Sequence, residues 1–430
     1  NWDKLKADEL ASKVFVRYIA SGTLWKMDNM FQLSIELYDT RDKQVIWSDR
    51  WQEDWNNLPS IKGNLSDGIL KALDTKPKVQ KQIETRNTEA YEYFLKGRHK
   101  MLTPDSKEDR KVAIDLLNKA IALDDSLLDA KCSLAHAQPT MEKRLNLIKS
   151  NIVEAKKLGD KNLLAQSYDS EGWTYWTLSQ NELAMISFKK AIKLFKATNN
   201  KAGLRISLSG LGWVNKFLGQ SNNAFKLIFE SINIAKEVED RNGLFGIYSQ
   251  LSLFYIIEEK YMEAINALEI CNQYSDATNH KDSIAVNYFS KGRIDLWKGN
   301  YKDSVDNFKA SNHNFDLLDD KTNLVWTHTW YILACTMKGD IDVTDDLSIL
   351  YNRISEGWLL DIDYPDVYFT LYKINKQLDD LDRAQSCLNL AYQKILQLSE
   401  CIQDEKYKKS YIENNFRKKI FSEWESYNKK

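Results

Sequence analysis

The segment SEGWTYWTLSQNELAMISFKKAIKLF (Ser170–Phe195) contains the residue spacing that decides the fold. Gly172 is followed twelve residues later by Ala184, and then by Phe188 and Ala191. A small residue on one helix lets a second helix approach closely, a small residue twelve positions on supplies the matching contact, and the large apolar residue fills the groove between them. The segment is therefore predicted to form a packed pair of helices.

The same spacing recurs in six units at a period of 40 residues. In chain order, the first position and the position twelve later are Gly172 and Ala184, Gly212 and Ala224, Ser252 and Ala264, Gly292 and Ser304, Ile332 and Thr344, and Tyr372 and Ala384. Because one helix pair leaves an apolar face uncovered, such units must stack into an α-α superhelical solenoid. The fold class is therefore predicted to be mainly α.

Two details modify this prediction. A glycine follows the first position by seven residues in three units, at Gly219, Gly299 and Gly339, which is typical of the turn between paired helices. In the fifth unit, the small-large-small set is replaced by Thr344, Ser348 and Tyr351. We expect a distortion or a local register slip in that unit.

The pattern resembles the tetratricopeptide repeat, although the period of 40 exceeds the usual 34. It is similar to the longer-helix variety found in signalling and regulatory proteins. We predict two irregular helix pairs over residues 88–160, six repeats over 161–402 and a polar capping helix over 403–430, because an open solenoid needs a polar end to stay soluble. A basic helix lying on a membrane surface is the alternative for the last segment.

Residues 1–75 have a different pattern, typical of a small α+β domain. The stretch from Phe31 to Tyr38 alternates apolar and polar residues, as in a strand with one covered face, and the polar turn TRDK and the strand-like QVIWSDRW follow it. With a further strand over Val16–Trp25, we predict a three-stranded antiparallel meander. Helices are expected on both sides of it, over 3–14 and 57–73, and a linker over 76–87.

Several positions in this domain match a known family. They are Val16–Ile19, Gly22, Gln32–Leu33, Leu37–Asp39 and Trp47–Trp51, followed by AYEYFLKG at 90–97. Residues 9–55 resemble the second half of the TolB-N-terminal-like domain that precedes repeats in many prokaryotic signalling proteins. The resemblance implies an output domain upstream in the same chain, either a class III adenylate or guanylate cyclase or a winged-helix DNA-binding domain. It places Asn1 inside the small domain, and by analogy with those cyclases it implies a homodimer.

The composition argues against several classes of partner. The 60 Lys and Arg residues against 61 Asp and Glu residues give a net charge of -1, so no global field attracts nucleic acid or an anionic membrane. No stretch approaches the run of about 18 apolar residues that spans a bilayer, and no signal peptide is visible. Five widely spaced cysteines without a CxxC motif are typical of reduced thiols. We expect a cytoplasmic region without nucleic-acid or membrane contact.

Motifs of catalysis and metal binding are missing from the sequence. It contains no GxGxxG, P-loop or HExxH motif, and its five histidines are scattered. The acidic DIDYPD (Asp361–Asp366) lacks the glycine and the closing glutamate of a calcium loop. It is better explained as an acidic N-terminal cap for a helix that starts near Pro365. We expect no cofactor, no metal and no enzymatic activity in this region.

The resemblance to tetratricopeptide solenoids implies a binding surface on the concave face. In that family the position after the small first residue lines this face, and here it is Trp173, Trp213, Leu253, Arg293, Leu333 and Lys373. Nearby on the same face are Asp169, Trp176, Lys216, Phe289 and Trp326. Indoles followed by cations suit an extended peptide or a ligand with a carboxylate. The candidate site comprises Trp173, Trp176, Trp213, Lys216, Phe289, Arg293, Trp326 and Lys373.

An alternative explains the same residues without a ligand. Long helices can bury tryptophans between repeats, and Arg293 and Lys373 are expected to be solvent-exposed in either case. Three functional hypotheses remain. The first is the sensor region of a cyclase-type signalling protein that binds a protein or peptide in its groove. The second is the equivalent region of a winged-helix transcription regulator. The third is a free-standing scaffold that brings partner proteins together.

Overall fold

The structure is a computed structural model, and two compact units make up the chain. One comprises Asn1–Arg98 with Ala113–Leu134, and the other comprises His99–Val112 with Ala135–Lys430. The residues that the structure describes are 18–27, 30–54, 65, 68–69, 71–72, 87–102, 104, 106–275, 280–339 and 342–428.

The first unit contains the predicted three-stranded antiparallel meander. Its strands are β1 (Tyr18–Met27), β2 (Met30–Asp39) and β3 (Gln44–Asp54), paired in the order β1-β2-β3. Phe31 and Leu37 of β2 are buried, as the alternation of this strand indicates. The helix expected over 3–14 lies outside the described residues, as do most of the helix expected over 57–73 and most of the expected linker.

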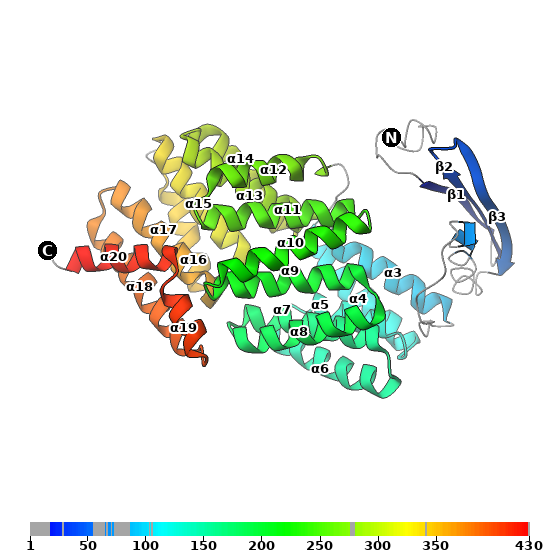
Figure 1. The fold of residues 1–430 in the computed structure, drawn as a ribbon. Helices are drawn as coiled ribbons and strands as arrows, with labels where there is room; N and C mark the ends of the chain where they lie inside the picture. The colour runs from blue at the N-terminus through cyan, green and yellow to red at the C-terminus, as the bar shows by residue number, and fades with distance from the viewer. Residues whose placement is uncertain are drawn as a thin grey trace. The chain divides into compact units, whose positions relative to one another are not determined.

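All other regular elements in the part of the chain that the structure describes are helices, and they alternate with short turns (Figure 1). Their bounds are α3 (Thr88–Leu102), α4 (Glu108–Leu123), α5 (Leu128–Ala137), α6 (Met141–Leu158), α7 (Lys161–Thr177), α8 (Asn181–Thr198), α9 (Lys201–Phe217), α10 (Ser221–Glu237), α11 (Arg241–Ile257), α12 (Tyr261–Asn272), α13 (Lys281–Lys298), α14 (Tyr301–Leu317), α15 (Lys321–Lys338), α16 (Thr344–Ser355), the 3-10 turn η4 (Asp361–Asp363), α17 (Tyr364–Gln377), α18 (Leu381–Glu400), α19 (Glu405–Ile412) and α20 (Asn415–Asn428). The prediction of a mainly α solenoid preceded by a small antiparallel sheet is confirmed.

The 40-residue period has a direct local cause at the helix starts. Asp160, Asn200, Asp240 and Asp320 each precede a helix and accept a hydrogen bond from the backbone N–H three residues later. This bond satisfies one of the free donors at a helix N-terminus. The helices α7, α9, α11 and α15 therefore begin at equivalent points of their repeats.

The turns inside the helix pairs also repeat. The residue seven after each first position has a positive φ in all six units, at Ser179, Gly219, Glu259, Gly299, Gly339 and Asp379. Three of these are the glycines noted in the sequence, whereas the other three adopt the left-handed conformation with a side chain at some energetic cost. The turn is thus fixed by the geometry of the pair and not by glycine alone.

Contacts inside each pair follow the predicted spacing. A Cβ atom on Gly172 would lie 2.9 Å from the Phe188 ring, and one on Gly292 would lie 2.8 Å from Phe308. Ser304 donates from its Oγ to the carbonyl of Gly292 at 2.8 Å. The small residues therefore hold the helices close enough for the phenyl rings to fill the groove.

The expected irregularity of the fifth unit is present. Helix α16 starts at Thr344 and has only 12 residues, and the 3-10 turn η4 separates it from α17. Helix α17 begins at Tyr364, with Pro365 in its first turn. Asp363 occupies the N-cap position, but its side chain makes no capping hydrogen bond, so the predicted acidic cap is only partly correct.

The C-terminal segment differs from the single capping helix that we predicted. It forms two helices, α19 and α20, which we call the tail (405–428). Besides packing on α18, the tail contacts the turns of the first two regular repeats. Glu182 of α8 accepts hydrogen bonds from the backbone N–H groups of Gln403 and Asp404, at 3.0 and 2.8 Å. Gln220 donates to Ser410 at 2.6 Å.

A buried aromatic side chain on α19 ties the tail to helix α9. Tyr411 is fully buried, and its ring lies 5.2 Å from that of Phe217. The Arg417 guanidinium is 3.4 Å from the centre of the Tyr411 ring and donates to the Tyr411 carbonyl at 2.8 Å. A Cβ atom on Gly219 would lie 2.2 Å from the carbonyl oxygen of Ser410, so only glycine allows this approach. The last helices are thereby tied to helix α9.

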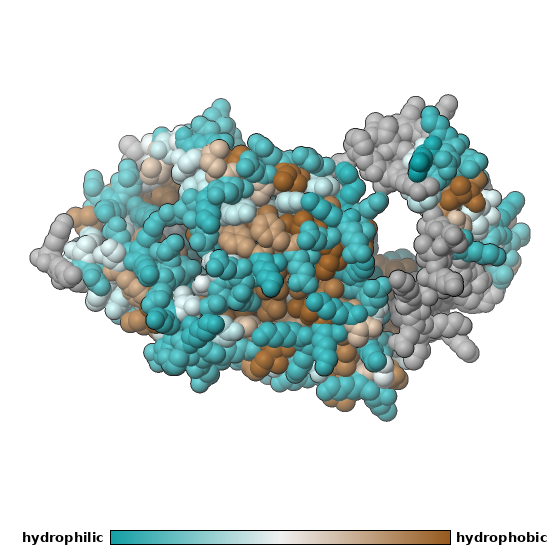
Figure 2. Space-filling view, in the orientation of Figure 1, coloured by the Kyte–Doolittle hydropathy of each residue, from teal (hydrophilic) through white to brown (hydrophobic). Residues whose placement is uncertain are grey.

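The outer face of the solenoid mixes apolar and polar side chains. Figure 2 shows brown apolar patches among teal hydrophilic side chains over helices α8–α12. Exposed apolar residues in this region include Leu183, Ile186, Ile206, Phe229 and Met262. Scattered exposed apolar side chains of this kind are ordinary for protein surfaces.

Candidate ligand-binding cavity

The second unit encloses a cavity of about 1710 Å³. The first helices of successive repeats (α7, α9, α11, α13, α15 and α17) line it, and residues 414–423 of the tail region complete the wall. The predicted concave face is therefore hollow. It is also covered in part by the tail, which the sequence did not indicate.

One half of the cavity has an aromatic floor. Trp326 stacks on Phe289 with ring centres 3.9 Å apart, and Trp330, one helical turn further along α15, meets Phe289 edge-on at 6.4 Å. Both indole N–H groups donate to the same carboxylate oxygen of Asp366 on α17, and the bond from Trp330 is 3.2 Å long. The carboxylate thus fixes two indoles in one orientation.

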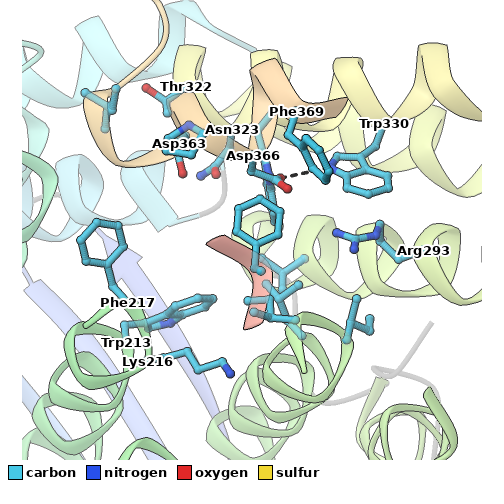
Figure 3. A pocket seen from close by; sticks show the side chains of 18 of the residues that line it. Trp213, Lys216, Phe217, Arg293, Thr322, Asn323, Trp330, Asp363, Asp366 and Phe369 are labelled. Atoms are coloured by element: carbon cyan, nitrogen blue, oxygen red, sulfur yellow. Dashed lines mark hydrogen bonds between the residues drawn. The ribbon is translucent and has the colours of Figure 1, made fainter. Parts of the chain in front are cut away.

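Two cations lie on this aromatic floor. The Arg293 guanidinium of α13 is 3.5 Å from the centre of the Trp330 ring, and the Lys373 ammonium of α17 is 4.6 Å from the Phe369 ring and 5.8 Å from Trp330. Figure 3 shows Arg293 beside Trp330, with Asp366 and Phe369 next to them. Although part of the Lys373 side chain is exposed, the surrounding cavity wall desolvates its ammonium group and lowers its pKa, and the positive charge of Arg293 lowers it further. Lys373 is exposed, as expected, but Arg293 is half-buried because its guanidinium lies against the Trp330 indole.

The opposite side of the cavity has a different chemistry. Trp176 and Trp213 approach each other at 6.0 Å, and Trp213 meets Phe254 edge-on at 4.8 Å. Lys216, one turn after Trp213, is buried and forms an ion pair with Glu258. Burial lowers the pKa of Lys216 although Glu258 favours its charged form. Lys216 therefore joins two repeats through this ion pair. Glu258 balances the positive charge of Lys216, so this residue attracts an anionic ligand only weakly.

A third sector of the cavity is acidic. Asp320, the N-cap of α15, and Asp363, before α17, lie on this side with Asp366. Burial raises the pKa of Asp363 to about 8, and the negative charges of Asp366 and Asp320 contribute. Arg110 and Arg144 also line the cavity. Burial raises the pKa of Asp320, whereas hydrogen bonds from Asn323 and the positive charge of Arg110 act to lower it. At neutral pH Asp363 is thus mostly protonated, which reduces the negative charge of this wall.

Six of the eight candidate residues line the cavity: Trp176, Trp213, Lys216, Arg293, Trp326 and Lys373. Phe289 does not, because it is fully buried beneath Trp326 and supports that indole from behind. Trp173 does not line it either, because its ring packs edge-on against Phe188 at 5.4 Å inside the first repeat.

Sequence reasoning missed several lining residues. Trp330 follows Trp326 by four residues, and Phe369 precedes Lys373 by four, so helical periodicity alone places each pair on one face. Phe416, Arg417 and Lys419 of the tail also line the cavity, but the repeat spacing in the sequence does not indicate them. Their place depends on the curvature of the solenoid, for which the sequence has no local signal.

Two further properties concern only the described part of the chain. No group of three or more His, Cys, Asp or Glu side chains there is arranged to hold a metal ion. Within the same residues, no helix is long and apolar enough to cross a membrane.

Stacked helix pairs with this spacing define a tetratricopeptide-type α-α solenoid. In agreement, residues 165–198 match the family model described as tetratricopeptide repeat. No curated protein sequence matches the chain.

Solved structures with a similar fold are known. A Rap protein complexed with competence and sporulation factor has a TM-score of 0.53 and 15% identity, with 78% of this chain and 98% of that chain covered. The apo form of RapI has a TM-score of 0.48 and 14% identity, with 72% and 99% covered. A Signal Transduction ATPase with Numerous Domains from Pyrococcus horikoshii, with a tetratricopeptide repeat sensor, has a TM-score of 0.44 and 14% identity, with 76% of this chain and 55% of that chain covered. At such identities the likeness to the Rap complex establishes the fold alone.

Proposed function

We propose that the second unit is a receptor region that binds a peptide or an extended protein segment in its cavity. The main support for this proposal is the cavity itself, which combines oriented indoles with cations along the first helices of consecutive repeats. Indole and arginine side chains supply most of the binding energy in many protein interfaces. The complex of the structurally similar Rap protein with competence and sporulation factor gives the proposal further support.

A peptide selection on the full chain tests this proposal. The purified protein is panned against a displayed library of random twelve-residue peptides, and selected peptides are titrated by fluorescence anisotropy. We expect saturable binding that Trp213→Ala weakens at least tenfold, because this indole lines the cavity. Trp25→Ala is the matched control, since Trp25 lies on strand β1 of the first unit, does not line the cavity and is 67% exposed. Equal affinity for both variants, or no enriched peptide, would overturn the proposal.

We also propose that this region regulates an output domain of the class III cyclase type in the same chain. The support is the resemblance of residues 9–55 to the TolB-N-terminal-like domain of such proteins. Mass spectrometry of the endogenous protein tests it, through peptides that extend upstream of Asn1. A cyclase domain there is the expected result. A winged-helix domain would instead make the protein a transcription regulator, and a natural terminus near Asn1 would favour a free-standing scaffold.

A further inference from the structure

Arg293 and Lys373 are held close together although both are positively charged. They come from different helices, α13 and α17, and both lie within 6 Å of the centre of the Trp330 ring, at 3.5 and 5.8 Å. Desolvation lowers the pKa of Lys373, and the positive charge of Arg293 lowers it further. The fold therefore maintains an electrostatic repulsion inside a cavity, which is unfavourable unless an anion relieves it.

The neighbouring carboxylates are engaged by other groups. Asp366 accepts both indole N–H bonds, and Glu259 forms an ion pair with Lys419 of the tail. Within the described residues, neither Arg293 nor Lys373 forms an ion pair with a carboxylate. The negative charges of Asp366 and Glu259 favour the charged form of Lys373 from a distance, but among the described residues no carboxylate pairs directly with either cation, in contrast to the buried pair of Lys216 with Glu258.

The surfaces around the two cations restrict how an anion can approach. The Arg293 guanidinium carbon is 3.5 Å from the centre of the Trp330 ring, so the indole covers one side of the group, and Phe369 lies against the Lys373 ammonium at 4.6 Å. A guanidinium edge binds an oxyanion through two parallel hydrogen bonds, and an ammonium group adds a compact charge. The aromatic walls favour a flat or apolar group directly attached to that anion.

From this arrangement we infer that Arg293 and Lys373 form a subsite for an oxyanion, a carboxylate or a phosphate, attached to an apolar group of the ligand. The inference rests on the proposed function, because it names the part of the ligand that enters this end of the cavity. Arg293 holds the anion through two hydrogen bonds, and Lys373 supplies the second charge. Trp330 orients Arg293, and Asp366 orients Trp330.

Small probes test the subsite without the natural ligand. The probes are N-acetylphenylalanine, its neutral amide and phenyl phosphate, added to full-length protein with ¹⁵N-labelled tryptophan. The indole resonance of Trp330 is assigned with Trp330→Phe. We expect a saturable shift with N-acetylphenylalanine, and an affinity at least tenfold lower for the amide. Stronger binding of phenyl phosphate identifies phosphate as the preferred anion, and weaker binding identifies a carboxylate. Equal shifts with acid and amide would overturn the inference.

Variants separate the subsite from the rest of the cavity. Arg293→Gln and Lys373→Gln should each abolish the saturable shift, whereas Arg293→Lys should retain part of it. Lys298→Gln is the control, because Lys298 is an exposed residue on the same helix. The peptides selected against the whole cavity are then titrated with Arg293→Gln. Unchanged peptide affinity, with Trp213→Ala still weakening it, would refute the subsite and leave the proposed function intact.

Discussion

The attachment of the tail can be tested by removing its anchor, with Tyr411→Ala. The substitution deletes a fully buried ring that packs on Phe217 and beneath the Arg417 guanidinium. Truncation of a buried aromatic residue to alanine costs about 3 to 5 kcal/mol. Helices as short as α19 and α20, with 8 and 14 residues, are marginal on their own. Most of this loss should therefore appear as local opening of the tail.

Hydrogen exchange followed by mass spectrometry measures this opening. A loss of about 3 kcal/mol raises the open population of α19 (405–412), the helix that carries Tyr411, by roughly a hundredfold, so exchange of its amides should accelerate by that factor. Amides of α13 and α14 should change little, because α13 and α14 are remote from the anchor in the repeat array. Tyr411→Phe is the control, since it keeps the ring and its contacts. Uniform acceleration along the solenoid, or none in the tail, would refute the reasoning.

Three further changes have expected outcomes. Gly219→Ala should make the tail accessible to proteases, because the added Cβ atom would clash with α19. Gly299 also has a positive φ but open space around it, so Gly299→Ala should lower the free energy of unfolding in urea by only about 1 kcal/mol. Asp363→Asn should raise the melting temperature more at pH 9 than at pH 5, and not at a pH below the ordinary aspartate pKa. Burial raises the carboxyl pKa to about 8, so the folded state retains a proton that the unfolded state has lost, and stability falls as pH rises from the ordinary aspartate value through 8. Lys216→Met should destabilise the protein by about 3 to 5 kcal/mol, and adding Glu258→Gln should restore part of this in the same unfolding assay.

Much of the fold could be predicted because its determinants are local. A small residue facing another twelve positions later dictates a close helix pair wherever it occurs, and Gly172 and Gly292 both face phenylalanine rings as expected. The alternation of Phe31–Tyr38 predicts a strand, and this strand pairs with β3 in one register up to a shift between Leu37 and Tyr38, which the alternation does not indicate. Such signals depend on neighbours in sequence, so one chain is enough to detect them.

The site was only partly predictable, since the period identifies a helix face but not how far that face is open. Phe289 precedes Arg293 by four residues and was expected beside it, yet Trp326 covers it. Arg293 was expected in solvent, whereas stacking on Trp330 half-buries it. Both differences arise from side chains of a neighbouring repeat, whose rotation relative to the first is a tertiary property.

The return of the tail to the second regular repeat has a consequence for how the chain folds. In most solenoids each unit touches only its neighbours, so contact order is low and folding can spread from any point. Here the hydrogen bonds of Gln220 with Ser410 and of Glu182 with Gln403 join residues 190 and 221 positions apart. Closing so long a loop is entropically costly and should come last. During synthesis, the cavity wall is therefore complete only after the tail has emerged from the ribosome, and a partly made chain has no finished binding site.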